Sequence, residues 1–363
     1  MTHSSMFNGW EMREPGKPLV PVSRPLPVPA AGQVRLRIAG TGVCHTDVSF
    51  LYGGVRTRKP LPIILGHEIA GIVDAAGEGA EAWLGRGVVV PAVIPCGQCE
   101  LCLKGRGAIC ASQVFPGSDA DGGFASHVLV PAHALARVDL GDAGLQGEIG
   151  RSGVGLAEHA VVADAVSTAY QAIRKSRLGH GSLAVFVGAG GVGGFGVQIA
   201  AALGALPVAI DVNARRLDLL SEHGAALTIL AGERDPDEIR QGVRDFARAR
   251  GLAASEWRIF ETSGTRSGQE LAFRLLGPGA YLGVVGYTRE AASLRLSNLM
   301  AFDAVAEGTW GCAPDLYPEV LRLVRAGKVK LEPFVERRPL ADVNQVLDAM
   351  HHGGLDRRVV LIP

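Results

Sequence analysis

The sequence has no excess charge of either sign, because 36 lysines and arginines balance 36 aspartates and glutamates. A neutral chain has no overall field to gather nucleic acid or an anionic membrane, although this balance does not exclude a local basic patch. The N-terminal stretch MTHSSMFNGWEMREPGKP also lacks the apolar segment of a secretory signal. We therefore expect a cytoplasmic protein without nucleic-acid or membrane partners.

Internal repeats and low-complexity tracts are absent as well. A chain of 363 residues is too long for one ordinary core, and its apolar content of 47% is enough for two folded domains. Residues 181–210 carry no charge and match a membrane span in length. Their dense glycines favour a buried strand–turn–helix–strand unit instead.

Four of the six cysteines lie within fifteen residues, in the stretch CGQCELCLKGRGAIC. The spacing of Cys96, Cys99, Cys102 and Cys110 is typical of zinc ligands, and in a reducing cytosol such clusters are more often metal sites than disulfides. A site with four protein ligands has no open position for a substrate, so a zinc here would be structural. Lys104 and Arg106 could offset the thiolate charge, and two disulfides or free thiols are the alternative.

Apolar periodicity changes along the chain. Short strands separated by Gly and Pro dominate the first 160 residues, which we expect to be all-β. From about residue 165, helices alternate with apolar strands, which predicts a parallel doubly wound sheet. The expected helices are 166–176, 192–203, 214–223, 236–250 and 267–276, the expected strands are 183–187, 207–210, 226–230, 258–261 and 281–285, and helices 315–326 and 341–352 with strand 358–362 follow.

A dinucleotide motif lies inside this alternation. Gly188-x-Gly190-x-x-Gly193 falls between a strand and a helix that contains Val192. These glycines allow a tight turn, close approach of the backbone to a pyrophosphate, and close packing of helix on strand. Asp211 ends the next strand, where it could bond both ribose hydroxyls and repel a 2′-phosphate, so we expect NAD rather than NADP. Arg215 and Arg216 weaken that preference, and a glycine-rich packing turn is the alternative.

Two further motifs, GVCHTD and LGHEIAG, contain Cys44 and His67. Taken alone, a buried cysteine and histidine are more often core residues than ligands. Beside a dinucleotide motif and a cysteine cluster, they fit a catalytic zinc, which uses three protein ligands and keeps one position open.

GVCHTD, GHEIAG, the four-cysteine loop and GAGGVG occur in the order found in the zinc-dependent medium-chain alcohol dehydrogenases, and the sequence resembles that family over nearly its whole length. The resemblance implies an α/β protein in which a GroES-like β-rich catalytic domain is interrupted by a Rossmann domain. The expected boundaries are residues 1–165 for the catalytic domain with its zinc loop at 96–110, 166–310 for the NAD-binding domain, and 311–363 for the return to the catalytic domain. Two zinc ions per chain, NAD and a homodimer or homotetramer are implied as well.

The resemblance carries Cys44 and His67 over as catalytic zinc ligands and the four clustered cysteines as structural ligands. DAVSTAY occupies the position of the third catalytic ligand and gives Asp164, whose alternative role is to cap the helix starting at residue 166. Glu68 is an alternate ligand or an outer partner, and Asp47 is a candidate acceptor for the His67 N–H.

Other site residues follow from the same resemblance. Thr46 matches the hydroxyl that takes the substrate's proton, whereas Ser49 replaces the histidine that often passes the proton on, so water would take over the exit. His45 could approach the cofactor phosphates. Arg358 matches an arginine on the pyrophosphate, and Val285 and Gly286 would place backbone near the nicotinamide.

Within the family, a closer likeness points to dehydrogenases that oxidise a ring alcohol beside an enoyl-CoA thioester in anaerobic aromatic degradation. It rests on WEMREPGKP, GVCHTDVSFLYGGVRT, PAVIPCGQCELCLKGRGAIC and PGSDADGGFASHVLVP. Arg56, Arg58 and Lys59 could meet CoA phosphates, or form a solvated loop.

Three other functions are alternatives. The same zinc could favour hydration of the conjugated product, with Glu158 and His159 handling protons unless they are surface residues. A broad secondary-alcohol dehydrogenase and a non-catalytic zinc and nucleotide-binding sensor complete the set.

Overall fold

The computed structural model describes residues 6–141 and 147–363. Residues 1–5, which begin the stretch expected to carry no signal, lie outside this range. Contacts within the chain divide it into two units. The first unit comprises Met1–Ser167, Gly311–Gly327 and Leu331–Pro363, and the second comprises Thr168–Trp310 and Lys328–Lys330.

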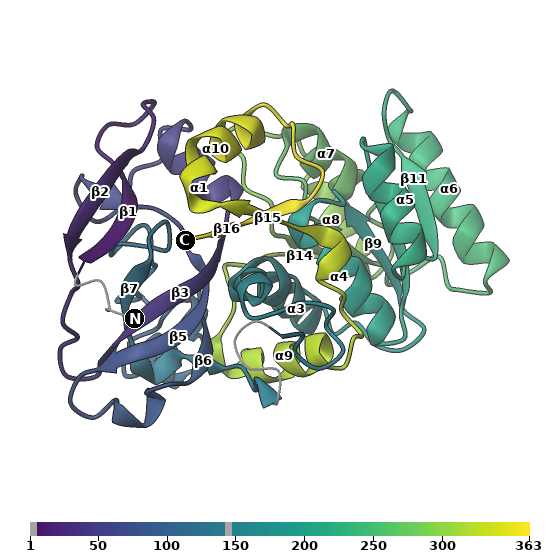
Figure 1. Ribbon diagram of the computed structural model, residues 1–363. Helices are drawn as coiled ribbons and strands as arrows, with labels where there is room; N and C mark the ends of the chain where they lie inside the picture. Colours follow the sequence, from purple (N-terminus) through teal and green to yellow (C-terminus); the bar gives the residue numbers. More distant parts are fainter. Residues whose placement is uncertain (1–5, 142–146) are drawn as a thin grey trace. The chain divides into compact units, whose positions relative to one another are not determined.

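The first unit is built on β-structure, as expected. Its larger sheet has the order β15-β16-β3-β5-β6-β8, with β7 pairing to β3. In β3, buried Val34, Leu36 and Ile38 alternate with more exposed Arg35 and Arg37, which confirms the predicted half-buried strand. The strands are β3 (Gln33–Gly42), β5 (Glu68–Ala76), β6 (Gly87–Val90), β7 (His127–Pro131), β8 (Ala136–Arg137), β15 (Val335–Pro339) and β16 (Arg358–Ile362), and a smaller sheet joins β2 (Val20–Pro25), β1 (Met6–Met12) and β4 (Ile63–Ile64) (Figure 1).

The expectation that the first 160 residues are all-β is wrong, because helical segments interrupt the strands. They are α1 (His45–Leu51), α2 (Glu100–Leu103) and several short 3₁₀ helices, among them one at Ala157–Ala163. Helix α1 begins because Asp47, in its first turn, accepts a hydrogen bond from the N–H of Cys44, the residue before the helix. Later in the chain, α9 (Tyr317–Arg325) and α10 (Val343–His351) confirm the two helices expected there.

The second unit confirms the parallel doubly wound sheet. Its strand order is β11-β10-β9-β12-β13-β14, and every neighbouring pair is parallel. The run without charge folds as β9 (Leu183–Val187), α4 (Gly191–Ala202) and β10 (Leu206–Asp211), so the strand–turn–helix–strand prediction is confirmed. The remaining elements are α3 (Ala165–Lys175), which enters the unit, α5 (Ala214–Glu222), β11 (Leu227–Leu230), α6 (Pro236–Ala249), β12 (Arg258–Glu261), α7 (Arg266–Arg274), β13 (Tyr281–Val284), α8 (Ser297–Phe302) and β14 (Val305–Gly308) (Figure 1).

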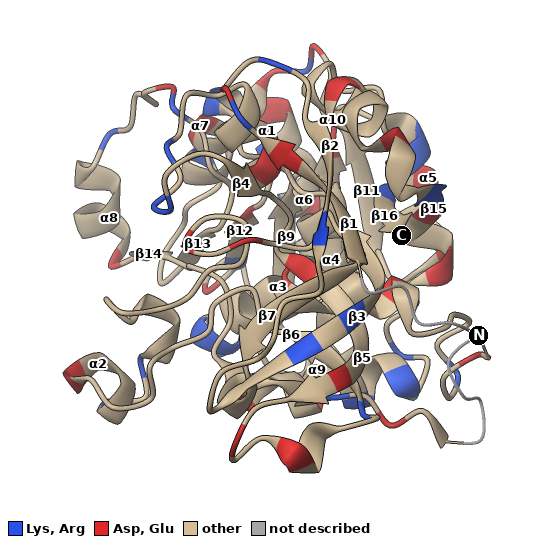
Figure 2. Cartoon of the chain, turned by 60° about the vertical axis from the view of Figure 1, so that its left-hand side comes forward, with Lys and Arg blue, Asp and Glu red and all other residues tan. Residues whose placement is uncertain are grey.

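Each unit has its own apolar core. Val185, Val208 and Ile259 are fully buried in the centre of the second unit, whereas Val34, Leu36 and Val88 belong to a core of the first. In the part of the chain that the structure describes, no helix combines the length and the apolar character needed to cross a membrane. Lysines and arginines are interspersed with acidic residues rather than gathered into one field (Figure 2).

Candidate active site

Three side chains of different chemistry meet inside the first unit. The ligand atoms of Cys44, His67 and Asp164 all lie within 4.8 Å of one another. Asp164 Oδ2 is 3.7 Å from Cys44 Sγ and 3.5 Å from His67 Nε2. Cys44 and His67 are buried, and Asp164 is partly exposed. A thiolate, an imidazole and a carboxylate in this proximity form a donor set that zinc accepts.

Each donor comes from a point where the backbone changes direction. Cys44 precedes α1, His67 precedes β5, and Asp164 lies between the 3₁₀ helix at Ala157–Ala163 and α3. Gly66 makes the turn before His67 with φ of +96°, and a Cβ on it would come within 2.7 Å of the Phe124 ring. Only glycine fits that position without strain.

Asp47 joins two of these segments. Its Oδ2 accepts the Cys44 N–H at 2.9 Å, and its Oδ1 accepts the Gly66 N–H at 3.1 Å. The expected hydrogen bond from His67 is not formed, although His67 Nδ1 lies 3.4 Å from Asp47 Oδ1. Because Asp47 is fully buried, its first role is to fix the backbone on which Cys44 and His67 stand.

The His67 ring tests whether the group suits a cation. It is 1% exposed, and neither ring nitrogen has a hydrogen-bond partner among the described residues. Burial alone lowers its pKa, but the charges of Asp47 and Cys44, together with the close approach of the Asp164 carboxyl group, outweigh burial and raise the pKa well above the ordinary value. The site therefore concentrates negative charge around a buried imidazole, which is the environment that a divalent cation would satisfy.

Glu68 lies outside this group in the structure, and its expected role as an alternate ligand or an outer partner stays a prediction. Arg358 bonds both of its oxygens, and Oε1 also accepts the Ala165 N–H at 3.1 Å. The same pairing occupies Arg358, which is 7% exposed, so the structure gives its guanidinium a partner other than a pyrophosphate. The sequence could not reveal this pair, because 290 positions separate the two residues.

Thr46 lies beside the donor set, with Oγ1 3.6 Å from Cys44 Sγ. Ser49, which stands where a relay histidine often does, donates its hydroxyl to the His45 carbonyl at 2.9 Å. That bond turns Ser49 toward its own helix. His45 itself is exposed.

The four clustered cysteines are also brought together. Their sulfurs lie within 4.8 Å of one another, with Cys99 3.5 Å from Cys102 and 3.6 Å from Cys110. An S–S bond is about 2.03–2.05 Å long, so the disulfide alternative is wrong. The backbone N–H groups of Gln98 and Cys99 lower the pKa of Cys96 to about 6, which favours the thiolate that zinc binds. Lys104 pairs with Glu100.

The dinucleotide motif forms the turn from β9 into α4 in the second unit. Gly188 has φ of +99°, and a Cβ on Gly193 would lie 1.9 Å from the Gly188 carbonyl oxygen, so turn and helix are closely packed. Around Gly190 a Cβ would meet only Arg216 Nη1, at 3.7 Å. Val192 lies in the first turn of α4. The open space at Gly190, next to a helix N-terminus, suits a pyrophosphate.

Asp211 ends β10 beside this turn. Its Oδ2 accepts the Ala189 N–H at 2.5 Å and its Oδ1 accepts the Asn213 N–H at 2.8 Å. Arg216 Nη1 is 4.0 Å from Asp211 Oδ1. Val285 and Gly286 follow β13, and both of their N–H groups bond the Glu261 carbonyl. Glu261 was not among the residues expected at the site, although its position at the end of a strand was a signal.

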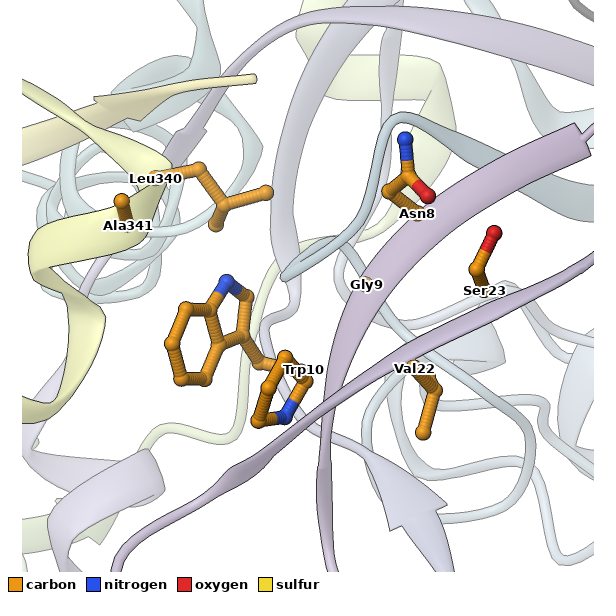
Figure 3. A pocket seen from close by; sticks show the side chains of 8 residues that line it. Asn8, Gly9, Trp10, Val22, Ser23, Leu340 and Ala341 are labelled. Atoms are coloured by element: carbon orange, nitrogen blue, oxygen red, sulfur yellow. The ribbon is translucent and has the colours of Figure 1, made fainter.

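The remaining polar candidates have structural partners. Glu158 and His159 are buried, so their alternative role as surface residues is wrong. Glu158 pairs with Arg337, and His159 Nδ1 donates to the Gly155 carbonyl at 2.7 Å. A separate pocket of 410 Å³ between β1, β2 and Leu340 is walled by the Trp10 ring and contains none of the candidate ligands (Figure 3).

The basic loop, which contains Arg56, Arg58 and Lys59, is partly neutralised by acidic residues. Arg58 Nη1 lies 3.5 Å from Asp119 Oδ1, and Lys59 pairs with Asp121. Arg56 is exposed, and no ion pair of its side chain occurs among the described residues. One of the three expected cations is therefore left for a ligand.

Comparisons with known proteins agree with this geometry. The model of the alcohol dehydrogenase GroES-like domain matches residues 30–139, and that of zinc-binding dehydrogenases matches residues 191–326. An alcohol dehydrogenase of Rhizobium meliloti is 30% identical to the chain and covers 96% of it and 97% of its own length.

Two solved structures are similar over almost the whole chain. The alcohol dehydrogenase of Aeropyrum pernix has a TM-score of 0.84 and 30% identity, covering 98% of this chain and 100% of its own. Acetophenone reductase from Geotrichum candidum, solved with NAD, has a TM-score of 0.84 and 26% identity, covering 100% and 99%. The GroES-like and Rossmann fold expected from the sequence is confirmed. The chain therefore belongs to the zinc-dependent medium-chain alcohol dehydrogenases, with zinc and NAD as its cofactors.

Proposed function

We propose that the protein oxidises a secondary ring alcohol to a ketone with hydride transfer to NAD, and that its substrate is 6-hydroxycyclohex-1-ene-1-carbonyl-CoA, which becomes the 6-oxo compound. The observation that carries the reaction is the Cys44, His67 and Asp164 group, whose atoms lie within 4.8 Å of one another. The substrate rests on the sequence likeness and on the exposed Arg56.

Cys44, His67 and Asp164 would hold the catalytic ion, and Cys96, Cys99, Cys102 and Cys110 the structural one. A zinc ion at the first site supplies Lewis-acid stabilisation of the negative charge that develops on the alcohol oxygen. The thiolate of Cys44 and the carboxylate of Asp164 balance the two positive charges of such an ion, while His67 binds in its neutral form.

The chain's own groups bind and orient the substrate and the cofactor. Thr46 Oγ1 accepts a hydrogen bond from the substrate hydroxyl and passes its own proton to water, because Ser49 is engaged by the His45 carbonyl. The turn at Gly188, Gly190 and Gly193, with Val192, carries the pyrophosphate. Asp211 accepts the ribose hydroxyls, with Arg216 beside it, and the backbone of Val285 and Gly286 lies at the nicotinamide.

A secondary alcohol and its ketone as the reacting pair are supported by one relative, whose name, acetophenone reductase, describes a ketone. The runner-up is a broad NAD-dependent secondary-alcohol dehydrogenase, which the match to alcohol dehydrogenases favours. Arg56 would meet a CoA phosphate, whereas Arg58 and Lys59 are engaged by acids. Hydration of the conjugated product stays a prediction. Glu158 and His159, the residues expected to handle its protons, are bonded to Arg337 and to the Gly155 carbonyl.

The test follows NADH formation with the CoA thioester, the same ring as a free acid, and simple secondary alcohols. We expect turnover of the thioester at least about a hundredfold above the others in kcat/KM, which corresponds to about 2.7 kcal/mol. Arg56→Glu should raise KM for the thioester, with Arg137→Glu as a control on another exposed arginine. Equal turnover of simple alcohols would replace the CoA substrate with the runner-up.

We also propose a cytoplasmic homodimer or homotetramer. Edge strand β14 presents Val305, which is 56% exposed. Leu296, directly before α8, and Met300 in α8 are 68% and 78% exposed. An unpaired edge beside apolar side chains suits pairing with a second copy. Light scattering on the wild type and on Met300→Lys tests this, and a monomeric wild type would contradict it.

A further inference from the structure

Glu261 and Thr262 occupy the centre of the carboxyl edge of the second unit's sheet. Strand β12 lies between β9 and β13, and Glu261 is in register with Val187 on one side and Val284 on the other. The chain reverses its direction across the sheet between β9 and β12. Ligands of open α/β sheets bind at such a reversal, outside the carboxyl ends of the strands.

Glu261 ties together the two loops that follow β12 and β13. Its Oε1 accepts the Ser263 N–H at 2.8 Å, the Ser263 hydroxyl at 2.6 Å and the Gly264 N–H at 3.1 Å. Its main-chain carbonyl accepts the N–H groups of Val285 and Gly286 at 2.9 and 3.0 Å. One residue therefore organises the backbone of both loops.

Thr262 connects the loop after β12 to the glycine turn after β9. Its hydroxyl oxygen lies 2.7 Å from the Gly188 carbonyl and 3.1 Å from the Val187 carbonyl. The contact with the glycines is close, since a Cβ on Gly188 would come within 2.5 Å of Ser263 N and one on Gly193 within 2.6 Å of Thr262 Oγ1. Small changes at residues 262–263 would therefore move the turn.

The Glu261 carboxyl group is costly to keep where it is. The residue is fully buried, its Oε2 has no hydrogen-bond partner among the described residues, and burial raises its pKa. A Cβ on Gly286 would lie 2.6 Å from that Oε2, so the carboxyl group is also in contact with the second loop. An apolar residue of similar size would avoid the cost of burial. Such a residue would, however, offer no side-chain acceptor to Ser263 and Gly264 in the loop after β12.

We propose that Glu261 is a positioning residue, which together with Thr262 holds the glycine turn, residues 263–264 and residues 285–286 in the arrangement that binds NAD. The inference rests on the proposed placement of NAD at Gly188 to Gly193 and at Val285 and Gly286. Glu261 acts through the backbone of these loops rather than by touching the cofactor.

The experiment compares Glu261→Leu, which removes the acceptors, with Glu261→Gln, which keeps one carbonyl acceptor for Ser263 and Gly264. NADH affinity is measured by fluorescence titration, together with Tm and zinc content. We expect Glu261→Leu to weaken NADH binding at least about tenfold, and Glu261→Gln to restore it to within about threefold of the wild type. Glu238→Gln, on the exposed first turn of α6, is the matched control for loss of one acid.

Two outcomes would overturn the inference: Glu261→Leu that binds NADH within about twofold of the wild type, or Glu261→Gln that binds as weakly as Glu261→Leu. If Glu261→Leu does not fold, Thr262→Val decides, because it keeps the shape and removes only the hydroxyl. Weakened NADH binding by this variant supports the inference, and unchanged binding overturns it. Failure of the wild type to bind NADH would instead contradict the proposed cofactor site.

Discussion

Arg358 and Glu68 form a buried ion pair next to the candidate zinc ligand His67, with Arg358 Nε 3.1 Å from Glu68 Oε2 and Nη2 bonded to Oε1. Gly42 leaves the space for it, since a Cβ there would lie 1.9 Å from Glu68 Oε2. Burial raises the pKa of Glu68 to about 7, Arg358 opposes that shift, and the charge of Asp164 adds to it. Arg358 therefore balances the charge of Glu68 beside the metal site.

Breaking this pair from one side should be costly. Arg358→Leu leaves the Glu68 carboxyl group buried without its partner, so that it must stay charged without a countercharge or take up a proton, and we expect the free energy of unfolding to fall by about 3–5 kcal/mol. Urea unfolding measures this change. Glu68→Leu combined with Arg358→Leu should recover part of it, because no buried charge is left. Arg322→Ala breaks the exposed pair with Glu319 and should lower the free energy of unfolding by less than about 1 kcal/mol. An equal loss for Arg358→Leu and Arg322→Ala would contradict this account.

The cysteine cluster predicts that one zinc ion per chain stabilises the loop without taking part in catalysis. Cys99→Ser should lose that ion and lower Tm by at least about 5 °C, since each kcal/mol shifts Tm by about 2–4 °C in a unit of this size. Zinc analysis and calorimetry check both effects. Gln98→Ala, whose exposed side chain lies next to the cluster, should change neither. Full zinc content and unchanged stability in Cys99→Ser would refute the structural site.

Asp164 is the least familiar member of the catalytic donor set, and its role can be tested by exchange of donor atoms. Asp164→Ala should lose the second zinc ion and lower kcat/KM by more than about a hundredfold, because even outer partners of a metal site are worth 10–100-fold. Asp164→Cys keeps one negative donor and should retain the metal. Asp245→Ala on the surface of α6 is the control. Full zinc content in Asp164→Ala would assign the third ligand elsewhere.

Local signals explain why much of the fold was predictable. Glycine spacing, apolar strands and the carboxylate of Asp211 lie within one short stretch, so the β9–α4–β10 unit could be predicted from that stretch alone. Helix α1 was missed because its first turn is stabilised by Asp47, whose second hydrogen bond goes to distant Gly66. Strand β14 was missed because its pattern is exposed, as befits an edge, and lacks an apolar run.

The candidate site was predictable only as far as the donors themselves. Cys44, His67 and Asp164 were expected from motifs and meet in the structure. The role of Arg358 as partner of Glu68 depends on a contact across 290 positions, which no local pattern encodes. The expected domain boundaries near residues 165 and 310 stay a prediction about organisation.

Cofactor preference should depend on Asp211. Its carboxylate would repel a 2′-phosphate, and Arg216 Nη1 lies only 4.0 Å from Oδ1. Asp211→Ser removes the negative charge and leaves the arginine to meet a phosphate, so we expect the ratio of kcat/KM for NADP to that for NAD to rise at least about tenfold. Asp218→Ser, exposed on α5, is the control for loss of one acid. An unchanged ratio would show that Asp211 is not the selector.

His159 should make stability depend on pH. Burial lowers its pKa below the ordinary value of about 6.5, so between the folded pKa and about 6.5 the unfolded chain binds more protons than the folded one. Stability from this group is therefore present above pH of about 6.5 and lost as the pH falls below it, with a slope of up to about 1.4 kcal/mol per pH unit. His159→Asn, which keeps a donor for the Gly155 carbonyl, should remove that slope, whereas His180→Asn at an exposed position should keep it. Urea unfolding of the three proteins between pH 5 and pH 8 measures the difference, and parallel curves for the wild type and His159→Asn would mean that His159 does not have to gain a proton when the chain unfolds.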